Sequence, residues 1–395
     1  MKRVLLLSGI QVFPPESGGN LRTASLAKSL AGLGCQVRIY SFTGRKADYK
    51  SFQRSDFHSP QPGILEYVNR SWILGFLQWA TYRLGLPDLW HFLPRPLGRQ
   101  FWACVESSDL VVADFPFLLR YLKKMKPGTR ILNSHNLEHE RWRENRFQRA
   151  CLAPLVKKIE EAASKIADWV LVSNAEEKDF YSVHSVNPGN ILLLPNAVAP
   201  DRFKPDPSLK VKVRRELGIE DDQKVILFAA SHYGPNREAY KTLLDFDREK
   251  SNWLEGQRIV FLVVGSVAPG PHRTKTLIAT GPVKSVDGYF AAADFAINPI
   301  RSGSGTNIKM AEYLLARLPT LATAFGKRGL TLKEGEDYVP LELSRISEGI
   351  TLMTDLTKEA SWKMAYNAYE RNRHLIDIGV ILQESFAPFL SRALS

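Results

Sequence analysis

The chain has 395 residues, of which 44% are hydrophobic and 24% are charged. This length is too great for one hydrophobic core and suits two domains, and the composition excludes a chain that is disordered over long stretches. The three cysteines have no CxxC spacing, which argues against a structural zinc site and is typical of proteins in a reducing compartment. No run of apolar residues approaches the ~20 that a membrane span needs. We therefore expect a cytoplasmic protein.

The net charge of +12 is concentrated in the first half of the chain. Residues 1–195 contain 26 Lys and Arg against 17 Asp and Glu, a balance of +9, and the remainder has 27 against 24, a balance of +3. A basic first half predicts a polyanionic partner. The candidates are an anionic lipid surface, a phosphorylated acceptor and nucleic acid. The alternative is a generally basic surface that keeps the protein soluble.

The first half alternates short apolar runs with helical patterns, as parallel sheets covered by helices do. The runs that we interpret as strands span residues 4–7, 37–42, 110–113, 130–133, 169–173 and 191–194. Between the first two, a helical leucine spacing ends at Gly34, a common stop signal. The first run has only four apolar residues, so we interpret it as a buried strand and not as a signal peptide.

Residues 72–92 stand apart because tryptophan and leucine gather there. They include Trp72, Phe76 and Trp79, and the arginines around them are Arg70, Arg83, Arg95 and Arg99. This combination suits a helix at a membrane interface. A helix packed on the core of the domain would show similar apolar spacing, and the sequence does not decide between the two.

The alternation restarts after a link around residues 200–207. The expected strands of the second half span residues 225–229, 259–264, 295–299 and 320–322. The run at 259–264 is uninterrupted, as in a strand buried on both faces. We therefore predict a first Rossmann-like domain at residues 1–198, a second at 199–357, and C-terminal helices at 358–395 that pack back towards the first domain.

The segment at residues 299–313 carries the strongest signal for chemistry, because it follows a predicted strand and opens a helical pattern. Its glycines let the backbone approach a ligand, and the amides at the helix N-terminus favour phosphate. Lys309 adds a cation in the first turn, and Glu312 on the same face would accept hydrogen bonds from ribose hydroxyls. The other predicted donor-binding residues here are Gly303, Ser304, Gly305, Thr306 and Asn307. The alternative is a Lys–Glu surface pair on an ordinary βα unit.

Two more segments follow predicted strands in the first half. Gly18 and Gly19 would bring the backbone near a ligand, with Arg22 in the first helical turn, although this is neither a Walker loop nor a GxGxxG fingerprint. His135 follows a strand at the end where α/β proteins bind ligands. The letters from His135 to His139 also spell the H-x-x-E-H pattern of zinc peptidases, but that pattern must lie in a helix and here it begins at the end of a strand.

Asp245 and Asp247 form a DxD pair, which metal-dependent transferases use to hold a cation on a diphosphate. The pair lies among residues with a helical pattern and has no second acidic cluster beside it. We interpret it as a solvated helix end and expect no metal site.

Taken together, these segments resemble the large retaining glycosyltransferase family 4, in order and over most of the chain. The matching segments are the glycine loop at 17–19, the ADxVxxxS strand at 168–173, the PNGVDxxxF junction at 194–203, the GSGTxxKxxE donor loop at 303–312 and the GxxGL segment at 324–330. His135 occupies the place of the histidine that lines the cleft in this family.

The resemblance implies a GT-B fold, in which two Rossmann-like domains face each other across a cleft. It implies retention at the anomeric carbon, a UDP- or GDP-linked sugar as donor, and no metal or other cofactor. The acceptor is then a glycan or a lipid-linked molecule of cell-envelope or polysaccharide biosynthesis, and nucleic acid is not an expected partner. His135, Lys309 and Glu312 occupy the catalytic places. We expect the protein in the cytoplasm, with the inner face of the plasma membrane as a candidate surface for peripheral contact.

Ser304 departs from the family pattern, because many members have the first Glu of Glu-x7-Glu at this position. Recognition of the sugar must then differ or rely on loop amides. This departure keeps a non-catalytic nucleotide-sugar-binding protein with a degenerate donor site as an alternative. A GT-B epimerase or phosphorylase is a further alternative, although no acid–base pair for an epimerase is evident and the chain is short for a phosphorylase.

A second departure lies at residues 229–237, where family members usually carry Arg and Lys to bind the diphosphate. This chain instead resembles a sub-branch with a Pro-Asn turn there. Ser231 and Arg237 remain donor-binding candidates in this segment. Lys309 and Arg328 would then carry more of the anion binding.

Overall fold

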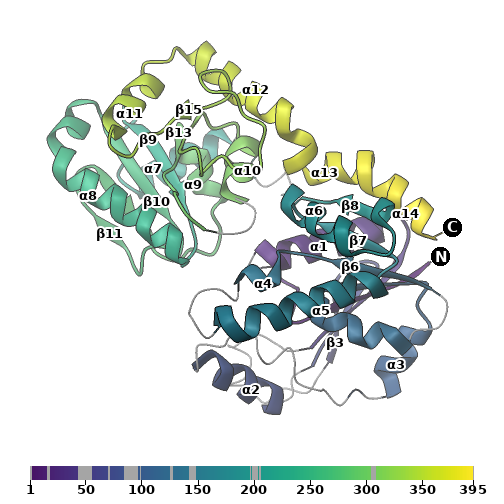
Figure 1. The fold of residues 1–395 in the computed structure, drawn as a ribbon. Coiled ribbons are helices and arrows are strands. Elements are labelled where there is room, and N and C mark those ends of the chain that lie inside the picture. Colours follow the sequence, from purple (N-terminus) through teal and green to yellow (C-terminus); the bar gives the residue numbers. More distant parts are fainter. Residues whose placement is uncertain are drawn as a thin grey trace. The chain divides into compact units, whose positions relative to one another are not determined.

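The structure is a computed structural model that describes residues 2–15, 18–42, 56–69, 72–83, 97, 99–124, 128–141, 148–195, 197, 203, 206–303 and 308–394. The chain divides into two units, one formed by residues 1–196 with 382–395 and the other by residues 197–381. Each unit is built around its own sheet, and Figure 1 labels their helices and strands. Residues 358–381 of the expected C-terminal helical segment group with the second unit.

The first unit contains an eight-stranded sheet in the order β3-β4-β2-β1-β5-β6-β7-β8. Its strands are β1 (Arg3–Ser8), β2 (Gln36–Ser41), β3 (Asp56–Gln61), β4 (Ile64–Val68), β5 (Leu110–Asp114), β6 (Thr129–Asn133), β7 (Trp169–Val172) and β8 (Ile191–Leu193). Neighbouring strands run parallel, except that β3 and β4 form an antiparallel pair. The six strands predicted from the apolar runs are present, whereas the β3–β4 pair was not predicted.

Helices of the first unit cover its sheet and follow its strands. They are α1 (Gly18–Gly32), α2 (Trp72–Arg83), α3 (Arg99–Glu106), α4 (Glu138–Arg141), α5 (Ala153–Ile166), α6 (Ala175–His184) and α14 (Ala387–Leu394), with shorter 3-10 or π segments at Pro116–Lys124, Gln148–Leu152, Pro188–Asn190 and Leu382–Phe386. Apolar residues of α3, α5, α6 and Pro116–Lys124 join those of β1, β5 and β7 in one cluster. These elements therefore cover one face of the sheet.

The last helix of the chain packs on the first unit. Thr129 in β6 donates a hydrogen bond from Oγ1 to the carbonyl of Ala393 at 2.6 Å. The ring of Phe389 meets that of Trp169 in β7 edge to face, with 4.8 Å between centroids. Helix α14 is thus part of this unit, although 185 residues of the second unit separate it from the rest in sequence.

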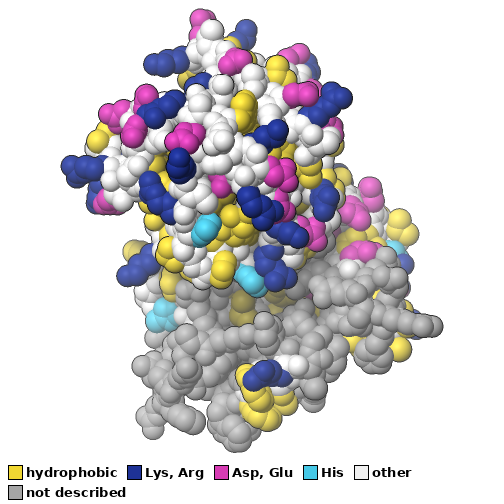
Figure 2. All heavy atoms as spheres, turned by 90° about the vertical axis from the view of Figure 1, so that its left-hand side faces the viewer, with side chains coloured by type: hydrophobic (Ala, Val, Ile, Leu, Met, Phe, Trp, Pro, Cys, Tyr) yellow, Lys and Arg dark blue, Asp and Glu magenta, His cyan; other side chains and the backbone are white. Residues whose placement is uncertain are grey.

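Helix α2 presents aromatic side chains to solvent. Phe76 is 56% exposed and Trp79 is 52% exposed, with 5.8 Å between their ring centroids. The guanidinium of Arg83 lies 5.6 Å from the centroid of the Trp79 ring. Figure 2 shows hydrophobic and basic side chains together at the bottom of the view, the end at which Figure 1 places α2. Trp72 opens this helix, but its side chain lies outside the described part of the structure.

The second unit contains a seven-stranded sheet in the order β11-β12-β10-β9-β13-β14-β15. Its strands are β9 (Lys224–Ala229), β10 (Ile259–Val264), β11 (His272–Arg273), β12 (Leu277–Ala279), β13 (Phe295–Asn298), β14 (Thr320–Ala322) and β15 (Val339–Pro340). Its helices are α7 (Pro207–Glu216), α8 (Gly234–Gly256), α9 (Asp287–Ala292), α10 (Ile308–Leu315), α11 (Ile346–Thr354), α12 (Lys358–Ile376) and α13 (Ile378–Ile381). The four strands predicted for this half are β9, β10, β13 and β14.

Strand β10 is buried along its whole length, as its apolar run predicts. Its alternate residues enter two different clusters, one with α9 and α10 and the other with α8 and α11. Helices therefore cover both faces of the second sheet, as in a Rossmann-like unit. Among the described residues, no helix is long and apolar enough to cross a bilayer.

Candidate active site

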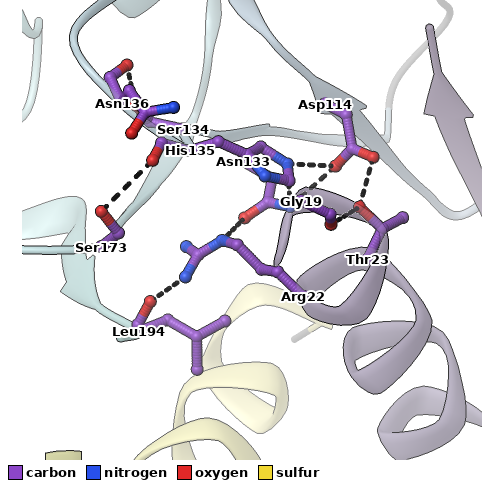
Figure 3. A network of polar contacts seen from close by, with 10 residues as sticks. All are labelled: Gly19, Arg22, Thr23, Asp114, Asn133, Ser134, His135, Asn136, Ser173 and Leu194. Atoms are coloured by element: carbon purple, nitrogen blue, oxygen red, sulfur yellow. Dashed lines mark hydrogen bonds and ion pairs between the residues drawn. The ribbon is translucent and has the colours of Figure 1, made fainter. Parts of the chain in front are cut away.

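Asp114 lies at the centre of a buried polar network in the first unit, drawn in Figure 3. It ends β5, directly opposite Asn133 at the end of β6, and is 1% exposed. One carboxylate oxygen accepts a hydrogen bond from Thr23 Oγ1 at 2.6 Å, and the other accepts one from Asn133 Nδ2 at 2.7 Å. A buried carboxylate is tolerated only with such partners, so this network holds α1 against the ends of two strands.

His135 lies against this network and is 4% exposed. Its Nε2 is 3.3 Å from Asp114 Oδ1, and its ring stacks on that of Phe115 with 4.7 Å between centroids. Its Nδ1 has no hydrogen-bond partner in the described part of the chain. A Cβ atom added to Gly19 would lie 3.4 Å from this nitrogen. The predicted glycines and the predicted histidine therefore come together in the first unit.

Arg22, predicted to bind the donor, is buried between structural elements. Its Nε donates to Asn133 Oδ1 at 2.9 Å, and its Nη1 donates to the carbonyl of Leu194. Burial lowers the pKa of its guanidinium to about 10, although the nearby carboxylates of Glu177 and Asp114 raise this pKa. The structure thus places Arg22 as a link between α1 and the ends of β6 and β8, and a contact with the donor stays a prediction.

Glu160 of α5 holds the segment that follows His135. This carboxylate is fully buried and accepts hydrogen bonds from the backbone N–H groups of Glu138 and His139, at 2.6 and 3.3 Å. It also lies 2.5 Å from His139 Nδ1. His135 and His139 therefore have different carboxylate neighbours, and His135 precedes α4 instead of sharing a helix with His139. No group of residues within the described ranges could hold a metal ion, so the zinc-peptidase pattern has no structural support.

Lys309 lies in the first turn of α10 in the second unit. Its Nζ donates to Asn236 Oδ1 at 3.0 Å, and Asn236 Nδ2 donates to the carbonyl of Ser231 at 2.9 Å. Burial lowers the pKa of the Lys309 ammonium to about 8. Glu312 raises this pKa and Arg328 lowers it. Lys309 thus lies near Glu312 and Arg328, and Asn236, which was not predicted, connects Lys309 to Ser231.

The backbone before α10 has the conformation that a glycine allows. Gly303 has a φ of +128°, and a Cβ atom there would lie 3.2 Å from Pro235 Cγ and 3.5 Å from the ring of Tyr233. The Pro-Asn turn therefore packs against the start of the predicted donor loop. The other predicted loop residues, Ser304, Gly305, Thr306 and Asn307, lie outside the described residues.

Two other candidates are near the surface. Arg237 is exposed on α8, one residue beyond the buried Asn236. Arg328 is partly exposed, and its guanidinium lies 4.0 Å from the centroid of the Phe325 ring. Arg328 is close enough to Lys309 to affect its pKa, so it remains a second cation for an anionic ligand.

The two aspartates of the DxD pair have other partners in the second unit. Asp245 forms an ion pair with Arg248 at 2.7 Å. Asp247 is 3% exposed and accepts hydrogen bonds from the hydroxyls of Thr274 and Thr276, at 2.9 and 2.5 Å. Asp247 is therefore not at a solvated helix end, because it joins α8 to the segment before β12. That part of the prediction is wrong.

Comparison with known proteins assigns the second unit to an enzyme class. Residues 223–345 match the family model described as "Glycosyl transferases group 1". This part of the chain is therefore similar to the group 1 glycosyltransferases. The match spans Ser231, Asn236, Lys309, Glu312 and Arg328, and it confirms the expected class of enzyme. Among curated proteins, none matches the sequence.

Solved structures similar to the whole chain have the same fold. Sucrose-phosphate synthase from Thermosynechococcus elongatus is 14% identical with a TM-score of 0.68, and 99% of each chain is covered. HepE from Anabaena, in complex with UDP and glucose, is 14% identical with a TM-score of 0.66, over 99% of this chain and 100% of that one. A UDP-forming α,α-trehalose-phosphate synthase from Burkholderia xenovorans is 10% identical with a TM-score of 0.66, over all of both chains. The expected GT-B fold is thereby confirmed.

Proposed function

We propose that the protein is a retaining glycosyltransferase that moves a sugar from a UDP- or GDP-linked donor to a glycan or lipid-linked acceptor. The observation that carries this proposal is the partly buried ammonium of Lys309 in the first turn of α10, within residues that match a group 1 glycosyltransferase model. A desolvated cation at a helix N-terminus is a site for a phosphate-bearing ligand. HepE, which was solved with UDP and with UDP-glucose, supports a nucleotide sugar as that ligand.

The chemistry requires stabilisation of a leaving group. The bond between the anomeric carbon and the diphosphate breaks, the acceptor oxygen bonds to the same carbon, and the hydroxyl proton leaves with the nucleoside diphosphate. Lys309 and the amides at the start of α10 would stabilise the negative charge that develops on the diphosphate. We assign His135 to the donor sugar, because it lies beside Gly19 and Asp114 at the ends of the strands and the family that the chain resembles has a histidine at this place.

We propose that this stabilisation needs no metal ion. The carboxylates of the DxD pair are engaged by Arg248 and by two threonines, which favours a structural role for both. Lys309 and Arg328 instead supply positive charge near the start of α10.

Substitution of Lys309 tests the proposal. The assay incubates the protein with a panel of UDP- and GDP-sugars and candidate acceptors, and measures the release of UDP or GDP. Lys309→Ala should lower kcat/KM by about 30–150-fold, because loss of a charge-assisted contact costs about 2–3 kcal/mol. Lys275→Ala is the matched control, since the Lys275 side chain is 73% exposed. A near-normal kcat/KM for Lys309→Ala would contradict the assignment of the site.

The same panel separates the enzyme from a binding protein with a degenerate donor site. If a nucleotide sugar raises the melting temperature but no nucleotide is released with any acceptor, the protein binds donors without turning them over. Release of UDP or GDP that depends on the acceptor would establish transfer.

We further propose that the first unit contacts an anionic membrane, where a lipid-linked acceptor would lie. Two observations favour this proposal. Phe76 and Trp79 are more than half exposed on α2, so their rings are not packed in the core. Residues 1–195 also carry a charge balance of +9, with 26 basic against 17 acidic residues. Exposed aromatic rings beside basic residues suit the interface of an anionic bilayer.

A further inference from the structure

Asn236 connects Lys309 to the backbone that follows β9. It lies in the first turn of α8 and is 4% exposed. Its Oδ1 accepts a hydrogen bond from Lys309 Nζ at 3.0 Å, and its Nδ2 donates one to the carbonyl of Ser231 at 2.9 Å. Because both groups belong to one planar amide, the bond to Ser231 fixes the direction in which Oδ1 faces the ammonium.

The residues just before Asn236 support this arrangement by packing. Pro235 and Tyr233 lie beside Gly303, where a Cβ atom would approach them to 3.2 and 3.5 Å. The turn at residues 233–236 therefore contacts two points of the predicted donor segment, its first residue Gly303 and the helical residue Lys309. These two contacts limit the positions that Lys309 can occupy.

An amide suits this place better than a carboxylate would. Within the described residues, Asn236 is the one hydrogen-bond partner of the Lys309 ammonium. An amide oxygen orients an ammonium group but leaves its charge intact, whereas a carboxylate would neutralise it. Of the charged groups near Lys309, Glu312 favours the charged ammonium and Arg328 opposes it, and burial opposes it most. An anionic ligand beside Lys309 would favour the charged ammonium and so offset the effects of burial and Arg328.

We propose that Asn236 is a positioning residue, which holds Lys309 in place without adding a charge of its own, so that the ammonium receives the diphosphate of the donor. This inference rests on the proposed function. Asn236 acts through Lys309 and needs no contact with the donor itself.

A double-mutant cycle tests the coupling between the two residues. Affinities for UDP and for GDP are measured by calorimetry for the wild type, Asn236→Ala, Lys309→Ala and the double variant. We expect about 10-fold weaker binding for Asn236→Ala, since a hydrogen bond to a charged group is lost. The double variant should bind no more weakly than Lys309→Ala alone. Glu238→Gln, at an exposed position of the same helix turn, is the control and should bind as the wild type does.

The outcomes separate this inference from the proposed function. If Lys309→Ala binds both nucleotides normally, the donor site itself is wrong. If Lys309→Ala binds weakly but Asn236→Ala binds normally, or if the two losses multiply in the double variant, only the positioning role is wrong. Melting curves for each variant show whether a loss of affinity reflects a loss of folded protein.

Asn236→Asp provides a readout that a structural role would not change. Aspartate keeps the size of the side chain and suits the first turn of a helix, so the fold should survive. It loses the hydrogen bond from Nδ2 to the Ser231 carbonyl, so the pH profile, and not the affinity alone, is the decisive readout. The new carboxylate would hold Lys309 but neutralise it, and we expect weaker binding of UDP and GDP at pH 7. It would also favour the charged ammonium, so any loss of affinity with rising pH should move to higher pH. An unchanged affinity at pH 7, with an unchanged pH profile, would overturn the proposal.

Discussion

At the scale of single residues, the ammonium of Lys309 makes nucleotide binding depend on pH. Its pKa is lowered from 10.5 to about 8, mainly by burial, so Lys309 is charged below pH 8 and loses its proton above it. A bound diphosphate favours the charged form, and the phosphates themselves are ionised above about pH 7. We therefore expect the affinity for UDP or GDP to be steady between pH 7 and 7.5 and to fall as the pH rises above 8. Above pH 8, binding of the nucleotide should be accompanied by uptake of a proton by Lys309.

Calorimetry in two buffers with different ionisation enthalpies measures this proton uptake at pH 8.5. Lys309→Arg is the control, because a guanidinium keeps its charge throughout this range. The nucleotide is the same in both titrations, so the difference between wild type and Lys309→Arg reports Lys309 alone. The same fall in affinity in both proteins would show that another group titrates.

The sequence predicted His135, Lys309 and Gly303 because each follows a strand or lies in a recognisable motif. It did not predict Asp114 or Asn236. Asp114 receives its hydrogen bond from a threonine 91 residues away, and Asn236 contacts a lysine 73 residues away. Neither pairing leaves a local pattern in the chain. Asp114 directly follows a predicted strand, and that position was the one signal that could have drawn attention to it.

At the scale of elements, helix α8 shows what a local pattern leaves out. The DxD letters mark a metal ligand or a helix surface, but Asp247 faces Thr274 and Thr276 from a buried position. Two hydroxyl donors satisfy its carboxylate, so Asp247 stabilises the packing of α8 against the next segment. The contact depends on a tertiary arrangement that the helical spacing does not encode.

We expect turnover to persist in EDTA and Asp247→Ala to affect stability instead of catalysis. Removal of this buried carboxylate leaves two hydroxyl groups without their partner, which should lower the free energy of unfolding by about 1–3 kcal/mol. Urea unfolding measures that loss, and kcat/KM of the folded variant should match the wild type. Asp245→Asn, which removes only an exposed ion pair, is the control and should change neither quantity. A strict requirement for Mn²⁺ or Mg²⁺ would contradict this prediction.

Central strands were easier to predict than edge strands. Strand β10 is buried on both faces and has an uninterrupted apolar run, so composition alone reveals it. Strands β3 and β4 form one edge of the first sheet, and β4 alternates buried and exposed residues. Strand β4 lies between β3 and β2 but carries the buried polar residue Glu66, so its sequence does not show the apolar run of a central strand. Strands β11, β12 and β15 span only two or three residues, too few to form a recognisable run.

At the scale of the whole molecule, the fold persists although the sequence has diverged. Structures that are only 10–14% identical cover 99% or more of this chain with TM-scores of 0.66–0.68. Buried apolar positions in alternating strands and helices suffice for such a fold, because many apolar residues fill a core equally well. The acceptor is a different matter, since the fold does not determine it.

Membrane contact should follow from the charge of the first half of the chain together with the exposed rings of α2. Basic residues near an anionic leaflet contribute about 1 kcal/mol each, so we expect the protein to float with acidic liposomes at low salt and not with neutral ones. Added salt should weaken this binding, because the attraction acts within a Debye length of about 10 Å at 0.1 M ionic strength.

The matched variants distinguish ring insertion from charge alone. Phe76→Ser with Trp79→Ser should reduce flotation without lowering the melting temperature, because both rings are more than half exposed. Trp362→Ser with Tyr366→Ser removes a stacked aromatic pair from α12 in the second unit and should leave flotation unchanged. If the wild-type protein does not float with acidic liposomes at low salt, the membrane proposal is wrong. The basic charge of residues 1–195 would then be assigned to a soluble phosphorylated acceptor, which a screen of sugar phosphates in the nucleotide-release assay would identify.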